Sequence, residues 1–157
     1  MPASTPKLQL DKYLPYLVNR VGTAMADHFT AAALERHQLS IMMWRVLVVL
    51  SNNGAGRLID VSRLTSIDPS TLSRMVARLS RLGLVSRQRS KTSDREVLIA
   101  LTPQGRKILA RLVPVGLQYE DKLVRGISAS DLAVTGRVLK RMYENLPAVR
   151  RRDRASV

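Results

Sequence analysis

Hydroxyl and guanidinium side chains recur at close spacing in residues 70–78, where they could bind an anionic polymer. Small hydroxyls let a backbone approach phosphates and base edges, and an arginine reaches guanine or phosphate oxygens. A solvated helix face usually mixes Glu with Lys as i,i+4 pairs, but no acidic residue follows Asp68 in this segment. We therefore favour nucleic-acid reading over a plain charged face for one set of residues: Ser70, Thr71, Ser73, Arg74, Ala77 and Arg78.

A second basic stretch lies just beyond, where the hydropathy pattern changes to a period of two. Arg87, Arg89 and Lys91 fall on one side of an expected strand, where they would run beside a phosphate backbone. After the polar loop that includes Ser93, Arg95 is placed to enter an adjacent minor groove, whose narrow walls concentrate negative potential. This stretch predicts a basic β-hairpin.

Asp94 is an exception in this basic surface, since a carboxylate beside phosphate is unfavourable unless it has a partner. We infer that Asp94 orients an arginine, which is either Arg95 itself or Arg74 or Arg78 on the preceding helix. The alternative is that Asp94 is an ordinary turn residue.

The charge balance of the whole chain points to the same class of partner. Lys and Arg number 26 and Asp and Glu number 12, so the net charge is +14. Such an excess favours a polyanion, with nucleic acid ahead of an anionic membrane surface, although it could serve solubility alone. None of the six aromatic residues lies in 71–105. Single-stranded RNA binders stack bases on aromatics, so double-stranded DNA is the expected partner.

The sequence shows no pattern typical of a catalytic site or a metal site. There is no cysteine, and the two histidines, His28 and His37, are nine residues apart, which puts them on opposite faces of a helix. No glycine-rich phosphate loop and no metal-ligand spacing occur. We expect no enzyme activity, no catalytic residue, no metal and no cofactor.

Neither the N-terminus nor the most apolar stretch predicts a membrane protein. The N-terminus lacks the basic head and apolar run of a signal peptide, and the apolar segment 41–50 contains an arginine and is too short to span a bilayer. We expect a cytoplasmic protein without a membrane segment.

The elements that must position these side chains are mostly helical. Asp68 followed by Pro69 is a strong helix start, and Gly83 ends that helix. Within it, apolar positions at helical spacing form an anchoring underside. The expected order is helices at 15–37, 40–50, 58–65 and 69–82, strands from 84 and from 95, and helices at 102–125 and 128–146.

Two details of side-chain direction follow from the same periodicities. In the helix 58–65 we expect Leu58, Val61 and Leu64 to face inward, and in the second strand Val97, Ile99 and Leu101. Pro114 and Gly116 predict a kink in the long helix. The fold class is therefore mainly α with a small β-hairpin wing, a winged helix–turn–helix flanked by further helices.

The basic helix and hairpin together resemble the MarR family of bacterial transcription regulators. The stretch "STLSRMVARLSRLGLVSR" followed by "SDREVLIALTPQG" is similar to the recognition helix and wing of that family, and the likeness covers about residues 12–146. One departure is in the turn before the helix, where Thr65 and Ser66 stand in place of the usual Leu and Gly. The residues that match the wing signature are Asp94, Arg95, Leu98, Leu101, Thr102 and Gly105.

The resemblance implies a homodimer in which the first and last helices join two subunits and each recognition helix enters a major groove. Independently, the apolar stripes of these two helices are hard for one monomer to cover, although they could pair within one chain. The expected organisation is an N-terminal arm and dimerisation helix at 1–37, a winged helix–turn–helix DNA-binding domain at 38–102, C-terminal dimerisation helices at 103–147 and a basic disordered tail at 148–157.

The resemblance also implies a pseudo-palindromic operator and release from DNA by a small aromatic or otherwise anionic molecule. Candidate effector-binding residues are Arg20 for an anionic group, His28 as a hydrogen-bond partner and Trp44 for stacking. Each could instead be an ordinary surface or core residue. The alternative function is a winged-helix nucleic-acid or protein-interaction module without operator specificity.

Overall fold

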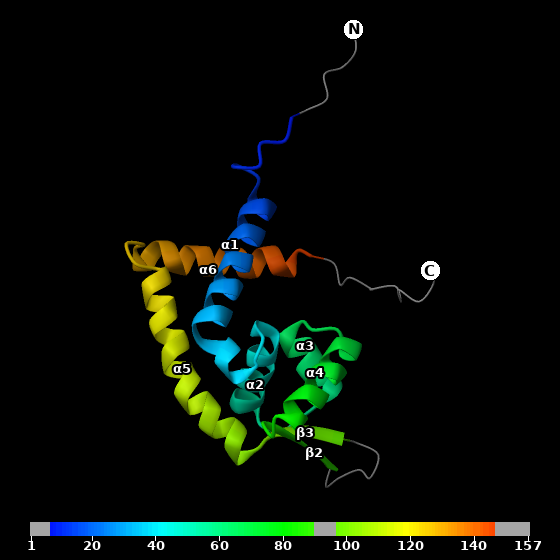
Figure 1. The fold of residues 1–157 in the computed structure, drawn as a ribbon. Helices are drawn as coiled ribbons and strands as arrows, with labels where there is room; N and C mark the ends of the chain where they lie inside the picture. The colour runs from blue at the N-terminus through cyan, green and yellow to red at the C-terminus, as the bar shows by residue number, and fades with distance from the viewer. Residues whose placement is uncertain (1–6, 90–96, 147–157) are drawn as a thin grey trace. The chain divides into compact units, whose positions relative to one another are not determined.

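The computed structural model describes residues 7–89 and 97–146, and Figure 1 shows its helices and strands. By its internal contacts the chain divides into two units, 1–117 and 118–157. The first unit holds the described strands, the helices that end before residue 118 and residues 103–117 of a long helix. The second holds residues 118–123 of that helix and the final helix.

The N-terminal helical segment changes its hydrogen-bonding pattern twice. Helix α1 (Leu14–Phe29) runs into a π turn (Thr30–Leu34) and then a 3-10 turn (Glu35–His37). The predicted extent of this helix, 15–37, is confirmed, but its last turns are not α-helical. The wider π turn carries Leu34, which is fully buried, and Gln38 ends the segment in the left-handed conformation with a φ of 57°.

Helix α2 (Ile41–Asn53) is the centre of the first unit's core. The Ser40 side chain accepts a hydrogen bond from the Met43 amide at 3.3 Å, as the predicted cap requires. Val46 and Leu47 are completely buried, so the expectation of a central helix is confirmed.

The helix–turn–helix consists of α3 (Leu58–Thr65) and α4 (Pro69–Arg81). Ser66 joins them in the left-handed conformation, with a φ of 56°, so this position adopts a backbone that glycine usually supplies. The prediction that Leu64 faces inward was wrong, because its side chain is 59% exposed. Ser62 and Thr65 are buried instead, since their hydroxyls donate to the carbonyls of Ile67 and Val61 at 2.6 and 2.7 Å.

The wing is a three-stranded antiparallel sheet in the order β1-β3-β2. Strands β2 (Val85–Arg89) and β3 (Val97–Leu101) form the predicted hairpin, with Val85 opposite Leu101. Strand β1 (Gly56–Arg57), which sequence reasoning missed, pairs with β3 on its other edge. Ile99 is buried as expected, but Val97 is 51% exposed because it lies toward the hairpin end, away from the core.

Helix α5 (Pro103–Leu123) begins directly after the sheet and contains Pro114. In the second unit, α6 (Ala129–Glu144) is capped by Ser128, whose hydroxyl accepts from the Asp131 amide at 3.1 Å. No residue of α6 is buried within this chain. The predicted tail at 148–157 lies outside the described residues.

Candidate nucleic-acid interface

The start of α4 is fixed by its cap. One carboxylate oxygen of Asp68 accepts hydrogen bonds from the amides of Ser70 and Thr71 at 3.0 and 3.1 Å, and Pro69 occupies the first turn. These bonds satisfy amides that an uncapped helix would leave without partners. The cap therefore holds the two hydroxyl residues at a defined end of the helix.

The two faces of α4 differ sharply in exposure. Leu72, Val76 and Leu79 are completely buried and anchor the helix to the first unit's core. On the other side the residues predicted from sequence come together on one surface, the α4 outer face. Its members are Ser70, Arg74, Ala77 and Arg78, which are exposed, and Thr71 and Ser73, which are half-buried.

The arginines of the α4 outer face are held weakly. The Arg74 guanidinium donates to the Thr71 hydroxyl at 3.5 Å, and that of Arg78 donates to the Gln38 carbonyl at 3.4 Å. Both distances are at the long limit for a hydrogen bond. Neither arginine has an acidic partner within residues 7–89 and 97–146. Both guanidinium groups can therefore turn toward an external anion.

Strand β2 contributes one described basic side chain, Arg87. Arg87 is exposed and lies opposite Ile99, and the Arg89 backbone lies opposite Val97. The other wing residues predicted from sequence lie outside the described residues: Lys91, Ser93, Asp94 and Arg95. The inferred pairing of Asp94 with an arginine stays a prediction.

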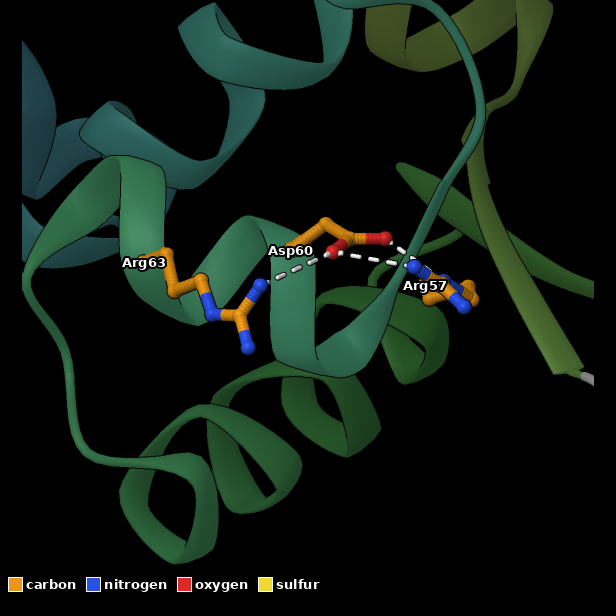
Figure 2. A network of polar contacts seen from close by, with 3 residues as sticks. All are labelled: Arg57, Asp60 and Arg63. Atoms are coloured by element: carbon orange, nitrogen blue, oxygen red, sulfur yellow. Dashed lines mark hydrogen bonds and ion pairs between the residues drawn. The ribbon is translucent and has the colours of Figure 1, made fainter.

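A polar network on α3 was missed by sequence reasoning. The Asp60 carboxylate accepts hydrogen bonds from Arg57 Nε at 2.6 Å and from its Nη2 at 3.3 Å, and an Arg63 nitrogen lies 4.0 Å away. Figure 2 shows the carboxylate between the two guanidinium groups. The hydrogen bond from Arg57 holds the pKa of the Asp60 carboxyl below its ordinary value. The Arg-x-x-Asp-x-x-Arg spacing is the signal that could have revealed it.

This network ties the wing to the helix–turn–helix. Arg57 belongs to β1, whereas Asp60 is in the first turn of α3, where a negative charge also suits the helix dipole. Asp60 therefore positions Arg57, and it leaves Arg63 with a side chain that is 76% exposed.

The three candidate effector residues have different surroundings. The Trp44 ring is half-buried and meets the Phe29 ring edge-on, with centroids 5.8 Å apart and planes at 62°. Gly116 lies against both rings, since a Cβ there would stand 3.6 Å from each. Arg20 and His28 are exposed on α1. The contact with Phe29 supports the core role that was the alternative for Trp44, and its effector role stays a prediction.

An open groove of about 480 Å³ lies beside the α4 outer face. We call it the α1–α4 groove, because its walls come from the end of α1, the turns that follow it, the start of α2, and α4. Its wall includes Asp27, Thr30, Ala31, Glu35, Leu39 and Arg78. None of the three candidate effector residues lines it.

The described residues offer neither a metal site nor a membrane span. In the part of the chain that the structure describes, no three His, Asp or Glu side chains gather so as to hold a metal ion. Among those residues, no helix has the length and apolar character needed to cross a membrane.

The sequence matches a known family of transcriptional regulators. The family model for the transcriptional regulator SarA/Rot matches residues 28–112, more than half of the 157 residues. The chain belongs to the winged-helix regulators of the SarA/Rot and MarR type. The matched segment runs from the end of α1 through the helix–turn–helix and the wing into α5.

Individual proteins that are similar to this MarR-type regulator are also transcriptional regulators. The HTH-type transcriptional repressor IacR of Pseudomonas putida is 25% identical over 113 residues, which cover 72% of this chain and 68% of IacR. A MarR family regulator from Silicibacter pomeroyi has a TM-score of 0.77 and 27% identity, with 91% of this chain and 98% of that chain covered.

A third relative is Bordetella bronchiseptica BpsR, whose DNA binding is regulated by 6-hydroxynicotinic acid. Its TM-score is 0.74 and its identity 25%, with 83% of this chain and 98% of that chain covered. The family and these relatives are transcriptional regulators and not enzymes. The expected fold class and the MarR resemblance are confirmed, and the chain is a DNA-binding regulator.

Proposed function

We propose that the protein is a homodimeric repressor that reads a pseudo-palindromic operator in double-stranded DNA and is released by a small molecule. The α4 outer face supports this most directly. Its hydroxyl and guanidinium groups are rigidly presented by a buried leucine and valine underside, and no described acidic residue neutralises Arg74 or Arg78. A surface of this kind is complementary to the acceptors on phosphates and on guanine.

The dimer is supported by apolar side chains that this chain leaves exposed. Val138, Leu139 and Tyr143 on α6 are between 43% and 65% exposed, and Leu14 and Val21 on α1 are 49% and 54% exposed. A helix with an uncovered apolar stripe usually buries it against another helix. A second copy of the chain is the partner that the expected organisation, with dimerisation helices at 1–37 and 103–147, assigns to these stripes.

The proposals of repression and of release by an effector are based on two relatives. IacR is a repressor, and the DNA binding of BpsR responds to an aromatic acid. We carry both properties to this chain, with Arg20, His28 and Trp44 as the first candidates to contact an aromatic acid. We also propose that the protein acts in the cytoplasm, as expected of a regulator that binds DNA in a cell like those of its bacterial relatives.

The experiment is selection of bound duplexes from a randomised library. Two subunits related by a two-fold axis should enrich an inverted repeat whose half-sites are about 10 bp apart. If no sequence is enriched although the library is bound, the protein is the alternative, a winged-helix module without operator specificity.

A further inference from the structure

The α1–α4 groove carries opposite charges on its two sides. Asp27 and Glu35 come from the end of α1 and the 3-10 turn, and Arg78 comes from α4. Between them Ala31 and Leu39 supply apolar surface. The groove therefore offers two acceptors, one cationic donor and an apolar wall within about 480 Å³.

The two carboxylates have nothing in the described chain to neutralise them. Asp27 and Glu35 are exposed, and the described residues provide neither side chain with a hydrogen bond or an ion pair. Glu35 also lies near the C-terminal end of the helical segment that ends at His37, where the helix dipole disfavours negative charge. Two such groups next to a face that must approach phosphate also oppose DNA binding unless a cation covers them.

Arg78 is bound only loosely on the other side. Within the described residues its guanidinium makes one hydrogen bond, 3.4 Å long, to the neutral carbonyl of Gln38. A ligand carboxylate would give the guanidinium shorter, charge-assisted hydrogen bonds, which are about twice as strong as neutral ones. The contact with Gln38 is thus one that a suitable ligand can replace.

We propose that the α1–α4 groove binds a small zwitterion, whose ammonium or amidinium group pairs with Asp27 and Glu35 while its carboxylate pairs with Arg78. The apolar body between the two charged ends lies against Ala31 and Leu39. None of the effector candidates Arg20, His28 and Trp44 lines this groove, and its chemistry calls for both charges in one molecule.

The regulatory consequence rests on the proposed function. Arg78 belongs to the α4 outer face, so a carboxylate that holds its guanidinium removes one cation from the DNA-reading surface. Ligand and duplex then compete for the same side chain. Because coupling between two binding equilibria is reciprocal, the ligand weakens DNA binding by the same factor by which DNA weakens ligand binding.

The first test measures binding to the full chain without DNA. The probes are 4-(aminomethyl)benzoate, which carries both charges, and its two halves, benzylamine and benzoate. Titrations followed by amide chemical shifts should give the zwitterion at least about tenfold higher affinity than either half, with the largest shifts in residues 27–40 and around residue 78. If benzylamine or benzoate binds as tightly as the zwitterion, the paired-charge site is wrong.

A matched pair of variants tests the residues. The double variant Asp27→Asn/Glu35→Gln should weaken binding of 4-(aminomethyl)benzoate at least about tenfold and leave the affinity for benzoate unchanged. The control is Glu120→Gln/Asp121→Asn, which removes the same charges from exposed positions on α5 and should change neither affinity. Equal affinities in the two double variants would overturn the proposal.

A second arm adds an operator duplex and separates this site from the proposed function. If the chain binds duplex but not the probe, the groove proposal fails and the function stands. If it binds the probe but no duplex, the function fails and the groove stands. If both bind independently of each other, the competition for Arg78 is wrong.

Discussion

The backbone of Gly105 lies directly against the carbonyl oxygen of Leu84, so closely that a Cβ at position 105 would overlap that oxygen. The contact is reinforced by neighbours, since the Leu84 carbonyl also accepts a hydrogen bond from the Thr102 amide at 3.1 Å. The Thr102 hydroxyl in turn donates to the Gly83 carbonyl at 2.6 Å and accepts from the Gly105 amide at 3.0 Å. The Leu-Thr-x-x-Gly motif therefore joins the start of α5 to the start of the wing.

Gly105→Ala should destabilise the protein by about 3 kcal/mol, because neither backbone can move without breaking the Thr102 hydrogen bonds. Chemical denaturation measures this loss. The control is Gly136→Ala in α6, where a Cβ meets nothing within 4 Å. That change should be neutral or stabilising by up to about 1 kcal/mol, since alanine favours a helix. Equal stability of the two variants would refute the close contact.

The link between Arg57 and Asp60 should make stability depend on acid pH. The pKa of Asp60 is lowered in the folded protein. Its contribution is therefore present at pH values above its ordinary pKa and is lost as the pH falls through the lowered value. Thermal melts should show Asp60→Asn less stable than the parent at pH 7, with the difference disappearing in acid.

Removal of the partner provides the control for that experiment. Arg57→Ala takes away the hydrogen bond that lowers the pKa of Asp60. Adding Asp60→Asn to Arg57→Ala should then have a smaller effect on the melting temperature than Asp60→Asn alone. An equal effect in both backgrounds would mean that Asp60 acts without Arg57.

The dimer should depend on the apolar stripe of α6. Leu139→Glu puts a charge on a side chain that is 43% exposed in the single chain. If a second copy covers it, burying that charge should raise the dimer dissociation constant at least about tenfold. Sedimentation measures the assembly. Leu64→Glu, at a 59% exposed leucine of α3, is the matched control and should leave the assembly unchanged.

Most helices and strands could be predicted from the sequence because the residues that mark their ends are close together in the chain. Asp68 with Pro69, and Ser128 with Asp131, mark helix starts by side-chain bonds that span only a few residues. The MarR-type wing signature was likewise contained in one stretch. What the sequence could not supply depends on distant neighbours. Strand β1 has two residues, Gly56 and Arg57, which are too few to show alternation and are recognised only by pairing with β3.

The wrong predictions of which side chains face inward also arose because burial depends on contacts that the helical pattern does not show. Leu64 fits the helical stripe, yet buried Ser62 and Thr65 form the inner side because their hydroxyls find carbonyl partners. The α4 outer face was predicted, since all of its residues lie on one helix. The α1–α4 groove was not, because Arg78 reaches the Gln38 carbonyl across forty positions of sequence.

Arg74 should contribute strongly to DNA affinity. It is exposed on the α4 outer face, and among the described residues its guanidinium is hydrogen-bonded to the Thr71 hydroxyl alone. Arg74→Ala should weaken binding of the selected operator about tenfold to a hundredfold, the usual value of one arginine that reads a base pair. Fluorescence anisotropy measures the loss. Arg111→Ala, on an exposed position of α5, removes the same charge and should have little effect.

The most direct measurement of duplex recognition is binding to the DNA upstream of the protein's own coding sequence at several salt concentrations. We expect affinity to fall by about 0.9 log units per tenfold rise in salt for each phosphate contacted, and the complex to survive an excess of random duplex. If random duplex or RNA displaces the upstream DNA equally well, the protein does not read an operator.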